Sequence, residues 1–311
     1  MDKLSQLILD GNRRALSKAI THIENRTETG KLIVSDLYRH RKTVPIIGIT
    51  GPPGAGKSTL ISELIKLYKS QSLKIGILAI DPTSVFSGGA ILGDRIRMME
   101  STSDGSVFVR SMASRGILGG LSSAAFNVLS IMECFGFDLI LLESVGAGQN
   151  EIEIHQYCDT VIVVAVSGLG DDIQAIKAGI YEIPDIFLIH KSDLPGSKEL
   201  RYQIETILEM TPSKSEWRVP ILLASSKEGT GIMDLIDKIK SHQEYLAKSN
   251  KREELRTKRT IHEIKRQTQE LVLHWLDRKN IEKTIEGLVQ EGKLSPNEIA
   301  NQLFEKLGLD K

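Results

Sequence analysis

The sequence is poor in cysteine: Cys134 and Cys158 are the only two among 311 residues, and they lack C-x-x-C spacing. We therefore expect no disulfide framework and a reducing compartment. An excess of charge of one sign is also missing, because 40 lysines and arginines balance 40 aspartates and glutamates. A neutral chain has no field that draws it to nucleic acid or to an anionic membrane, so we expect neither as a partner.

Long hydrophobic runs are absent as well. The first residues, MDKLSQ, contain no uninterrupted apolar stretch of the kind found in secretory signals. No later window approaches the roughly 20 apolar residues that cross a bilayer. The sequence therefore predicts a soluble, cytoplasmic protein, with room for a nucleotide-binding core of about 200 residues and one or two helical attachments.

The segment that organises the chain is GPPGAGKST, residues 51–59, between an apolar run at 44–49 and an amphipathic run at 60–67. A strand, a glycine loop and a helix in this order point backbone N–H groups at one place, which suits the phosphates of a nucleotide. Lys57, on a solvent-facing loop, would reach the β- and γ-phosphates, and Ser58 would put a hydroxyl on Mg²⁺. A glycine turn that binds nothing is the alternative. The expected phosphate-binding residues are Gly51, Gly54, Ala55, Gly56, Lys57, Ser58 and Thr59.

Two acidic residues stand at the ends of predicted strands: Asp81 follows the strand at 74–80, and Glu143 follows the strand at 137–142. The carboxyl ends of parallel strands are where α/β sheets place ligands, so both carboxylates are candidates for holding Mg²⁺ or its water. Gly146 can present its amide to the γ-phosphate. For this second segment, a strand end followed by an ordinary turn is the alternative.

A glycine-rich stretch at residues 87–95 contains Asp94 and is followed by Arg97. Loops that close on a γ-phosphate often have this composition, although an ordinary surface loop has it too. No residue is a secure general base. Gln149 is a candidate for orienting the attacking water, but only if its loop folds back. We therefore predict slow intrinsic turnover that a partner accelerates.

Strand-like and helix-like segments alternate through the middle of the chain; further strands are expected at 107–110, 160–166, 186–189 and 219–223, and helices at 122–134 and 197–210. This alternation predicts an α/β fold, a P-loop NTPase with a doubly wound, mainly parallel sheet. We expect a core at 44–247 between helical extensions at 1–43 and 248–311, the second forming the dimer through an apolar stripe that includes Trp275. The charged run at 248–259 indicates a linker or a solvated helix face, or else a basic contact surface.

The motifs GPPGAGKST, DPTS, GGAILGDRIRM, ESVGAGQNE, GDDIQAIKAG and HKSD, in this order and spacing, resemble the MeaB/MMAA (ArgK) family of P-loop GTPases. Members of this family are associated with adenosylcobalamin-dependent methylmalonyl-CoA mutase, and some are labelled LAO/AO transport system kinases or ATPases. The resemblance implies a homodimeric GTPase that uses GTP, GDP and Mg²⁺. It also implies a chaperone of the mutase, one that gates cofactor loading and protects the mutase from inactivation.

The resemblance also implies roles at matching positions. Asp81, Asp94 and Glu143 would form the acidic surroundings of the metal bound by Ser58, and Arg97 would stabilise charge on the transferring phosphoryl group. Residues 143–151 resemble switch II, and residues 168–177 resemble the segment that relays the nucleotide state to the mutase. The residues expected to take part in catalysis are Lys57, Asp94, Arg97, Glu143 and Gln149.

One motif departs from the family, because members carry N-K-x-D for the guanine base and this chain has His190 in place of the asparagine. Asp193 remains, and its carboxylate would accept from guanine N1–H and the 2-amino group, a pair of donors that adenine lacks. His190 can still give the base one hydrogen bond from a ring nitrogen. We expect GTP to be preferred over ATP, with weakened selectivity. The residues expected around the base are His190, Lys191, Asp193, Ser225, Ser226 and Lys227, the last three resembling the S-A-K element at guanine O6.

Two other functions stay open: an ATPase or kinase linked to lysine, arginine and ornithine transport, and a metal-delivery GTPase. The first needs a phosphoacceptor site, and we identify none in the sequence. The second normally comes with a Cys-x-x-Cys or a histidine-rich tract, whereas the seven histidines here are scattered. Every version of the nucleotide site requires Asp81 and Glu143 to lie close to Lys57 in the folded chain.

Overall fold

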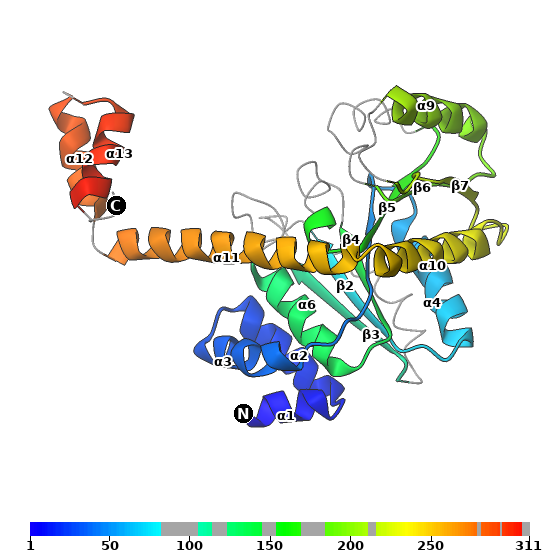
Figure 1. Ribbon diagram of the computed structural model, residues 1–311, viewed down its shortest axis with the longest axis horizontal. Helices are drawn as coiled ribbons and strands as arrows, with labels where there is room; N and C mark the ends of the chain where they lie inside the picture. Colours follow the sequence, from blue (N-terminus) through cyan, green and yellow to red (C-terminus); the bar gives the residue numbers. More distant parts are fainter. Residues whose placement is uncertain are drawn as a thin grey trace. The chain divides into compact units, whose positions relative to one another are not determined.

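The computed structural model describes residues 1–81, 105–113, 123–144, 154–168, 184–210, 216–278, 281–292 and 294–306 (Figure 1). Four expected site residues lie outside these ranges: Asp94, Arg97, Gly146 and Gln149. The chain divides into two compact units, Met1–Arg259 and Thr260–Lys311, which are described separately below.

Seven strands form the sheet of the first unit, in the order β3-β2-β4-β1-β5-β6-β7 (Figure 1). They are β1 (Ile46–Thr50), β2 (Ile75–Asp81), β3 (Val107–Ala113), β4 (Leu139–Ser144), β5 (Thr160–Ala165), β6 (Ile186–His190) and β7 (Ile221–Ala224). Every neighbouring pair runs parallel, which confirms the predicted doubly wound sheet. The strand order reverses beside β1, and such a switch point is where open α/β sheets bind their ligands.

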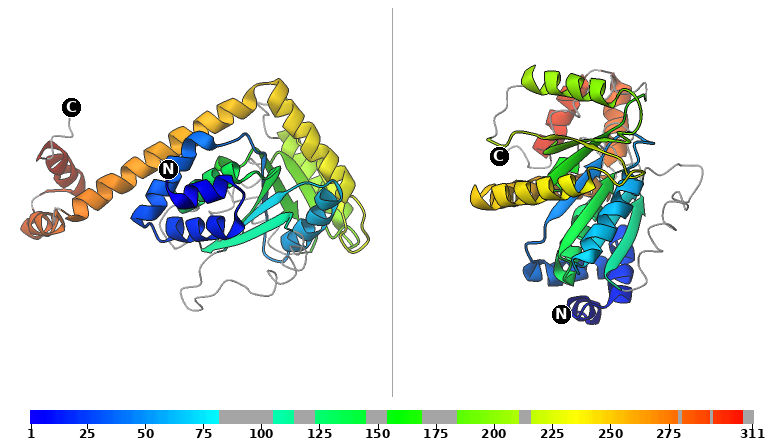
Figure 2. Two further views of the ribbon diagram at one scale, coloured as in Figure 1. Left: turned by 90° about the horizontal axis from the view of Figure 1, so that it is seen from below. Right: turned by 90° about the vertical axis from the view of Figure 1, so that its right-hand side faces the viewer.

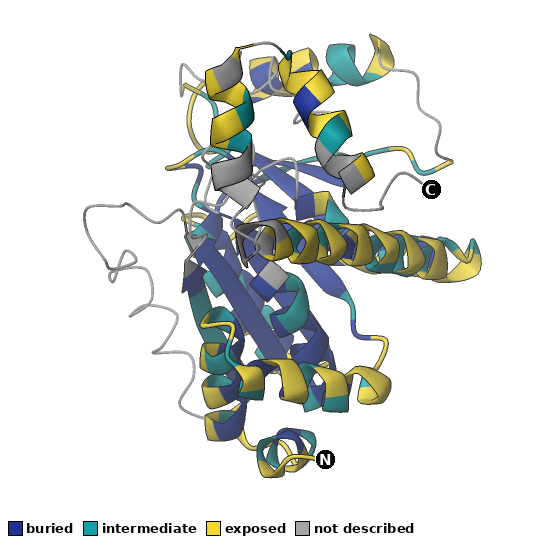
Figure 3. Ribbon diagram, turned by 90° about the vertical axis from the view of Figure 1, so that its left-hand side faces the viewer, coloured by how far each residue is buried: buried dark blue, intermediate teal, exposed yellow. Residues whose placement is uncertain are grey.

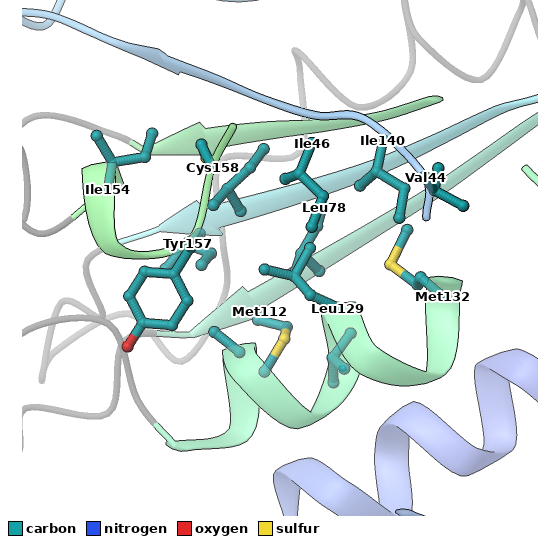
Figure 4. Close-up of a cluster of buried hydrophobic side chains, with 14 of the residues drawn as sticks. Val44, Ile46, Leu78, Met112, Leu129, Met132, Ile140, Ile154, Tyr157 and Cys158 are labelled. Carbon is teal, nitrogen blue, oxygen red and sulfur yellow. The ribbon is translucent and has the colours of Figure 1, made fainter. Parts of the chain in front are cut away.

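Helices cover both faces of the sheet, as the continuous apolar strands require, because every residue of β1, β4, β5 and β6 is buried. One face packs against α4 (Lys57–Ser70) and α10 (Ile232–Lys248), the other against α6 (Ser123–Phe135). Figure 3 shows that the strands of the sheet are largely buried. Figure 4 shows part of the α6 side, where Leu129 and Met132 of the helix lie near Ile46 and Ile140 of the sheet. The remaining elements of this layer system are α9 (Ser197–Met210), η1 (Tyr38–His40) and η2 (Ile154–Gln156).

The N-terminal segment is helical, as predicted, and consists of α1 (Lys3–Leu9), α2 (Arg13–Glu24) and α3 (Glu28–Leu37). Each helix has an N-cap side chain that accepts from its backbone, namely Asp2, Asn12 and Thr27. These three helices share one buried cluster with α6; their fully buried members include Ile8, Leu16, Ile20, Ile33 and Leu37. The N-terminal helices therefore complete the α6 side of the first unit.

The charged run at 248–259 is not a linker, because the helix α11 (Lys251–Arg278) begins inside it. Arg256 lies 2.7 Å from Glu133, and Arg259 lies 2.8 Å from Asp159. Both carboxylates are buried, and a buried charge is costly unless it is paired, so these pairs hold the start of α11 against the first unit. The prediction of a solvated face is wrong on this side of the helix, whereas Lys258 on the other side is exposed.

The second unit contains the remainder of α11, from Thr260, with α12 (Ile281–Glu291) and α13 (Pro296–Lys306). A capping box begins α13: the backbone N–H of Ser295 donates to Glu298 at 2.7 Å, and Glu298 N–H donates to the Ser295 hydroxyl at 3.4 Å. None of the helices in the described ranges is long and apolar enough to cross a membrane.

Candidate functional site

The glycine loop joins the end of β1 to the start of α4 and is held in a form that only glycine permits at two positions. Gly51 and Gly56 have φ angles of 143° and 89°. A Cβ on Gly51 would lie 2.2 Å from the carbonyl oxygen of Val164, and one on Gly56 would lie 2.4 Å from Nδ1 of His190. The glycines are therefore required by close packing as well as by dihedral angle, and they leave the first N–H groups of α4 facing the loop.

Lys57 is the first residue of α4, and its ammonium group lies inside the loop. Its Nζ donates to the carbonyl oxygens of Gly51 at 2.7 Å and Pro52 at 3.1 Å. The residue is only 6% exposed, so the expectation of a solvent-facing lysine is wrong. Two backbone carbonyls compensate the buried charge and keep the ammonium group where the loop curves around it.

Ser58 and Glu143 bring the start of α4 and the end of β4 together. The Ser58 hydroxyl donates to Glu143 Oε1 at 3.0 Å, and Glu143 is buried. Glu143 lies opposite Ala79 in the β2–β4 register, so Asp81, two residues further along β2, stands at the same carboxyl edge of the sheet. The structure describes the backbone of Asp81 and not its side chain. A serine hydroxyl and a carboxylate at a helix N-terminus provide the hard oxygen ligands that Mg²⁺ prefers.

A buried hydroxyl pair beside these acids was not predicted from the sequence. Ser144, next to Glu143 on β4, donates to the hydroxyl of Thr50 on β1 at 2.9 Å, and both residues are buried. The sequence signal for this pair is the polar residue that ends each of two otherwise apolar strands. This hydrogen bond ties the tips of β1 and β4 together where the glycine loop begins.

His190 is the last residue of β6 and is almost fully buried. Its Nδ1 lies 2.9 Å from the carbonyl oxygen of Ala55, and its Nε2 lies 2.8 Å from the hydroxyl of Ser226. Because a carbonyl only accepts, Nδ1 must carry the proton, and Nε2 then accepts from Ser226. Burial lowers the pKa of His190 below its usual value, which favours this neutral form.

The hydrogen bonds of His190 give it a role that the sequence did not predict, distinct from the expected contact with the base. Both ring nitrogens are engaged within the protein, one on the glycine loop and one on the loop after β7. His190 therefore links these two loops by hydrogen bonds. Gly56 leaves room for the imidazole of His190, since any larger residue there would collide with it.

Lys191 and Asp193 extend the same connection. Lys191 Nζ donates to the carbonyl oxygen of Gly54 at 2.8 Å, and the Ser225 hydroxyl donates to Asp193 Oδ1 at 2.6 Å. That hydrogen bond holds the pKa of Asp193 below its usual value, so the exposed carboxylate is ionised and acts as an acceptor. Lys227 is exposed beside it. The structure thus gathers the expected phosphate and base residues around one end of the sheet.

Part of the expected site cannot be placed. Asp94, Arg97, Gly146 and Gln149 lie outside the described residues, as does most of the segment 168–177. Within the described ranges, no group of three or more histidine, cysteine, aspartate or glutamate side chains is arranged to hold a metal ion.

Comparison with known proteins identifies the family. The chain matches the family model described as methylmalonyl Co-A mutase-associated GTPase MeaB over residues 16–280. A protein named as a GTPase from Pyrococcus horikoshii is 41% identical over 99% of this chain and 98% of its own length. GTPase ArgK of Escherichia coli is 32% identical over 86% of this chain and 83% of its own. The mouse protein named methylmalonic aciduria type A homolog, mitochondrial, is 32% identical over 98% of this chain and 79% of its own.

A solved structure described as an LAO/AO transport system kinase has the same fold. It superposes with a TM-score of 0.74 and covers 98% of this chain and 97% of its own, at 24% identity. Identity at that level supports the fold alone, so the assignment rests on the family model and on the sequence relatives. Since that model spans most of the chain and the relatives exceed 30% identity over 79% to 98% of their own length, this chain belongs to the MeaB family of P-loop GTPases.

Proposed function

We propose that this GTPase is a chaperone of an adenosylcobalamin-dependent methylmalonyl-CoA mutase, gating the loading of the cofactor and protecting the mutase from inactivation. The family description names the mutase, and this supports the choice of client. The single observation that carries the nucleotide site is the 3.0 Å contact between Ser58 and Glu143 beside the glycine loop. A GTP-dependent change at this contact would alter the end of β4, where the segment resembling switch II begins.

The proposed ligands are GTP or GDP with Mg²⁺. Ser58 and Glu143 supply hard oxygen atoms suited to Mg²⁺, and we propose Asp81 and Asp94 as further acidic residues of that site. When bound, Mg²⁺ would neutralise part of the phosphate charge. Lys57 supplies a fixed positive charge from the protein side, and the N–H groups of the loop and of α4 orient the phosphates.

We propose that Asp193 selects guanine by accepting from N1–H and the 2-amino group. Ser225 supports this role, because its hydroxyl donates to one carboxylate oxygen and fixes the side chain. His190 acts indirectly by holding Ser226 and the glycine loop at a set spacing. GTP is therefore preferred over ATP without a direct histidine contact to the base.

Turnover is proposed to be slow in the isolated protein and faster with the partner. Arg97 and Gln149 would stabilise the transferring phosphoryl group and orient the water, and Gly146 would meet the γ-phosphate, once their segments take up the hydrolysing arrangement. Hydrolysis would then serve as a clock on mutase loading.

We further propose a homodimer formed through the C-terminal helices. In the second unit, α11 carries a stripe of exposed apolar side chains, consisting of Ile261, Ile264, Leu271 and Trp275. The proposed regions remain a helical extension at 1–43, a core at 44–247 and a dimerisation region at 248–311, with the first residues of the last held to the core by the arginine pairs. Cys134 and Cys158 are unbridged thiols, in keeping with work in the reducing cytoplasm.

The test is reconstitution with the methylmalonyl-CoA mutase of the same cell. The chain bound to a non-hydrolysable GTP analogue should copurify with the mutase, the mutase should accelerate GTP hydrolysis, and transfer of adenosylcobalamin to the apo-mutase should depend on GTP. Ser58→Ala should abolish these effects. Ser62→Ala is the matched control, because Ser62 lies one turn along α4 and its hydroxyl bonds to the backbone of Ser58.

Absence of a complex, together with unchanged hydrolysis in the presence of the mutase, would contradict the proposal. Phosphotransfer from GTP or ATP to a purified transport protein would instead favour the kinase alternative.

A further inference from the structure

A groove of about 860 Å³ lies between α2 and β3, and none of the described residues of the nucleotide site lines it. One wall consists of residues 107–111 of β3, and the other consists of Arg13, Arg14, Ser17, Lys18 and Thr21 of α2. Figure 2 shows the N-terminal helices beside this strand. Successive side chains of a strand point to opposite faces of the sheet, so a wall of five consecutive residues is the edge of the strand. Val107 and Phe108 are buried, whereas residues 109–111 are partly exposed to the groove.

The edge of β3 that lines the groove carries hydrogen-bonding groups that no described strand uses. Among the described residues only β2 pairs with β3, on the opposite side. Ile75 of β2 donates to the carbonyl oxygen of Ser106 at 2.8 Å and lies opposite Val107 in the register. In a parallel ladder, alternate residues turn their N–H and C=O groups to the same neighbour. Val107, Val109 and Ser111 therefore turn these groups to the groove side, and of the three Val109 and Ser111 are accessible, because Val107 is fully buried.

The groove is positively charged although the chain as a whole is neutral. Four of its described lining residues are Arg13, Arg14, Lys18 and Arg110, and none of the described lining residues is acidic. Arg110 is paired with Glu24, which leaves three cations over the groove. Arg14 and Lys18 are exposed, and the guanidinium of Arg13 lies 6.0 Å from the ring centroid of Phe108.

We propose that this groove binds an extended acidic segment of a partner protein, which adds a strand to the edge of β3 and places carboxylates against Arg13, Arg14 and Lys18. In this mode of recognition the backbone ladder supplies affinity and the alternating side chains supply specificity. The ladder favours a peptide over nucleic acid, which could meet the cations but has no matching N–H and C=O groups.

Two other uses of this edge fit less well. A second copy pairing edge to edge would bring the same three cations toward one another, which opposes association. Cations can also guard an edge strand against unwanted pairing. Protection of the edge would need only the charges. Here the face of α2 and the edge of β3 also enclose a groove, which is about 16 Å long because it spans five strand residues at about 3.3 Å each.

The test uses a fluorescent heptapeptide that alternates glutamate with valine, titrated into the full chain by fluorescence anisotropy. Arg14→Glu combined with Lys18→Glu should weaken its binding at least about tenfold, with basal GTP hydrolysis unchanged. Lys238→Glu combined with Lys240→Glu, on exposed positions of α10, should leave binding as it is. A peptide with lysine in place of glutamate, and one N-methylated on alternate backbone nitrogens, should both bind poorly.

Amide hydrogen exchange measured by NMR tests the backbone pairing at the edge of β3, which electrostatic attraction alone would not produce. Binding of the glutamate peptide should slow exchange at Val109 and Ser111 and leave Phe108 and Arg110 little changed. The proposal is overturned if the glutamate peptide does not bind, if the double charge reversal has no effect, or if binding leaves these two amides unprotected. Tighter binding of polyuridylate, abolished by the same charge reversal, would also overturn it, in favour of a phosphate-binding groove.

Discussion

His190 Nε2 and the Ser226 hydroxyl lie 2.8 Å apart, and the other ring nitrogen of His190 lies 2.9 Å from the Ala55 carbonyl oxygen. One buried side chain thus joins the glycine loop to the loop after β7. The first loop is expected to meet the phosphates and the second the base, so the imidazole sets the spacing between two ends of the proposed nucleotide site. The residue that departs from the family motif thereby has a structural role.

Replacing His190 should weaken nucleotide binding. His190→Ala leaves the Ala55 carbonyl without its donor and frees the two loops, so we expect the affinity for GDP to fall about tenfold. His190→Asn should retain more of it, because an amide can donate to one partner and accept from the other. Titration with a fluorescent GDP analogue measures both, with the exposed His40→Ala as control. Equal affinities of the alanine variant and the unmodified chain for GDP would rule out this linking role of His190.

Base selection should depend on Asp193. Asp193→Asn replaces an acceptor, which Ser225 holds in place, by an amide that can turn its donor toward the base. We expect the ratio of GTP to ATP affinity to fall about tenfold or more. Competition of GTP and ATP for a bound fluorescent nucleotide gives this ratio. Glu199→Gln, an exposed acid on α9, is the control and should not change it.

The fold could be read from the sequence because its signals are local. Most strands of the sheet are largely apolar runs, and the glycine loop follows the first of them. Strand ends were less accurate: Glu143 and Ser144 belong to β4, since they pair with Ile49 and Ile80. Pairing with neighbouring strands extends a strand beyond its last apolar residue, and hydropathy does not report it.

Contacts between distant charged residues could not be read in this way. Arg256 and Glu133 are 123 residues apart in the chain yet form a hydrogen-bonded ion pair. Their meeting depends on how the first residues of α11 pack against α6, which local periodicity does not encode. The same limit applies to His190, whose two partners lie 135 and 36 residues away, and it explains why its structural role was missed.

The ion pair of Arg259 and Asp159 should be important for stability. Asp159 is buried, the Arg259 side chain is only 9% exposed, and Asp159 also accepts from the backbone N–H of Ile46 at 2.9 Å, at the start of β1. Arg259→Ala would leave a buried carboxylate without its cation, so we expect the free energy of unfolding to fall by about 3 kcal/mol. Urea denaturation measures it.

The neighbouring Lys258→Ala provides the control for this prediction. Lys258 is exposed, and its replacement should change the free energy of unfolding by no more than about 0.5 kcal/mol. Combining Arg259→Ala with Asp159→Asn should cost less than the two single changes added together, because the pair is removed as a unit. Similar losses for Arg259→Ala and Lys258→Ala would refute the proposed importance of the pair.

Both thiols should be inert in the folded protein. Burial raises the pKa of Cys134 to about 12 and also raises that of Cys158, so the reactive thiolate is scarce in each. Cys134 further donates to the backbone carbonyls of Leu37 and Ser130 at 3.3 Å. We expect iodoacetamide to modify neither residue at pH 8 until urea unfolds the chain, as measured by intact mass. Rapid modification of the native protein at either position would show that the surrounding core opens readily.

The response to magnesium should depend on one hydroxyl. Ser58 donates to Glu143 at 3.0 Å, so both oxygens are in place beside the glycine loop. In the unmodified chain, chelating Mg²⁺ with EDTA should lower the affinity for GTP about tenfold or more, because the phosphate charge is then less well neutralised. Ser58→Ala should bind GTP as weakly in the presence of Mg²⁺ as the unmodified chain does in EDTA, and chelation should change it little further. Ser62→Ala, one turn along the same helix, should keep the full response. A Ser58→Ala protein that still lost affinity on chelation would mean that the metal is held by other residues, and the proposed role of the Ser58–Glu143 contact would have to be abandoned.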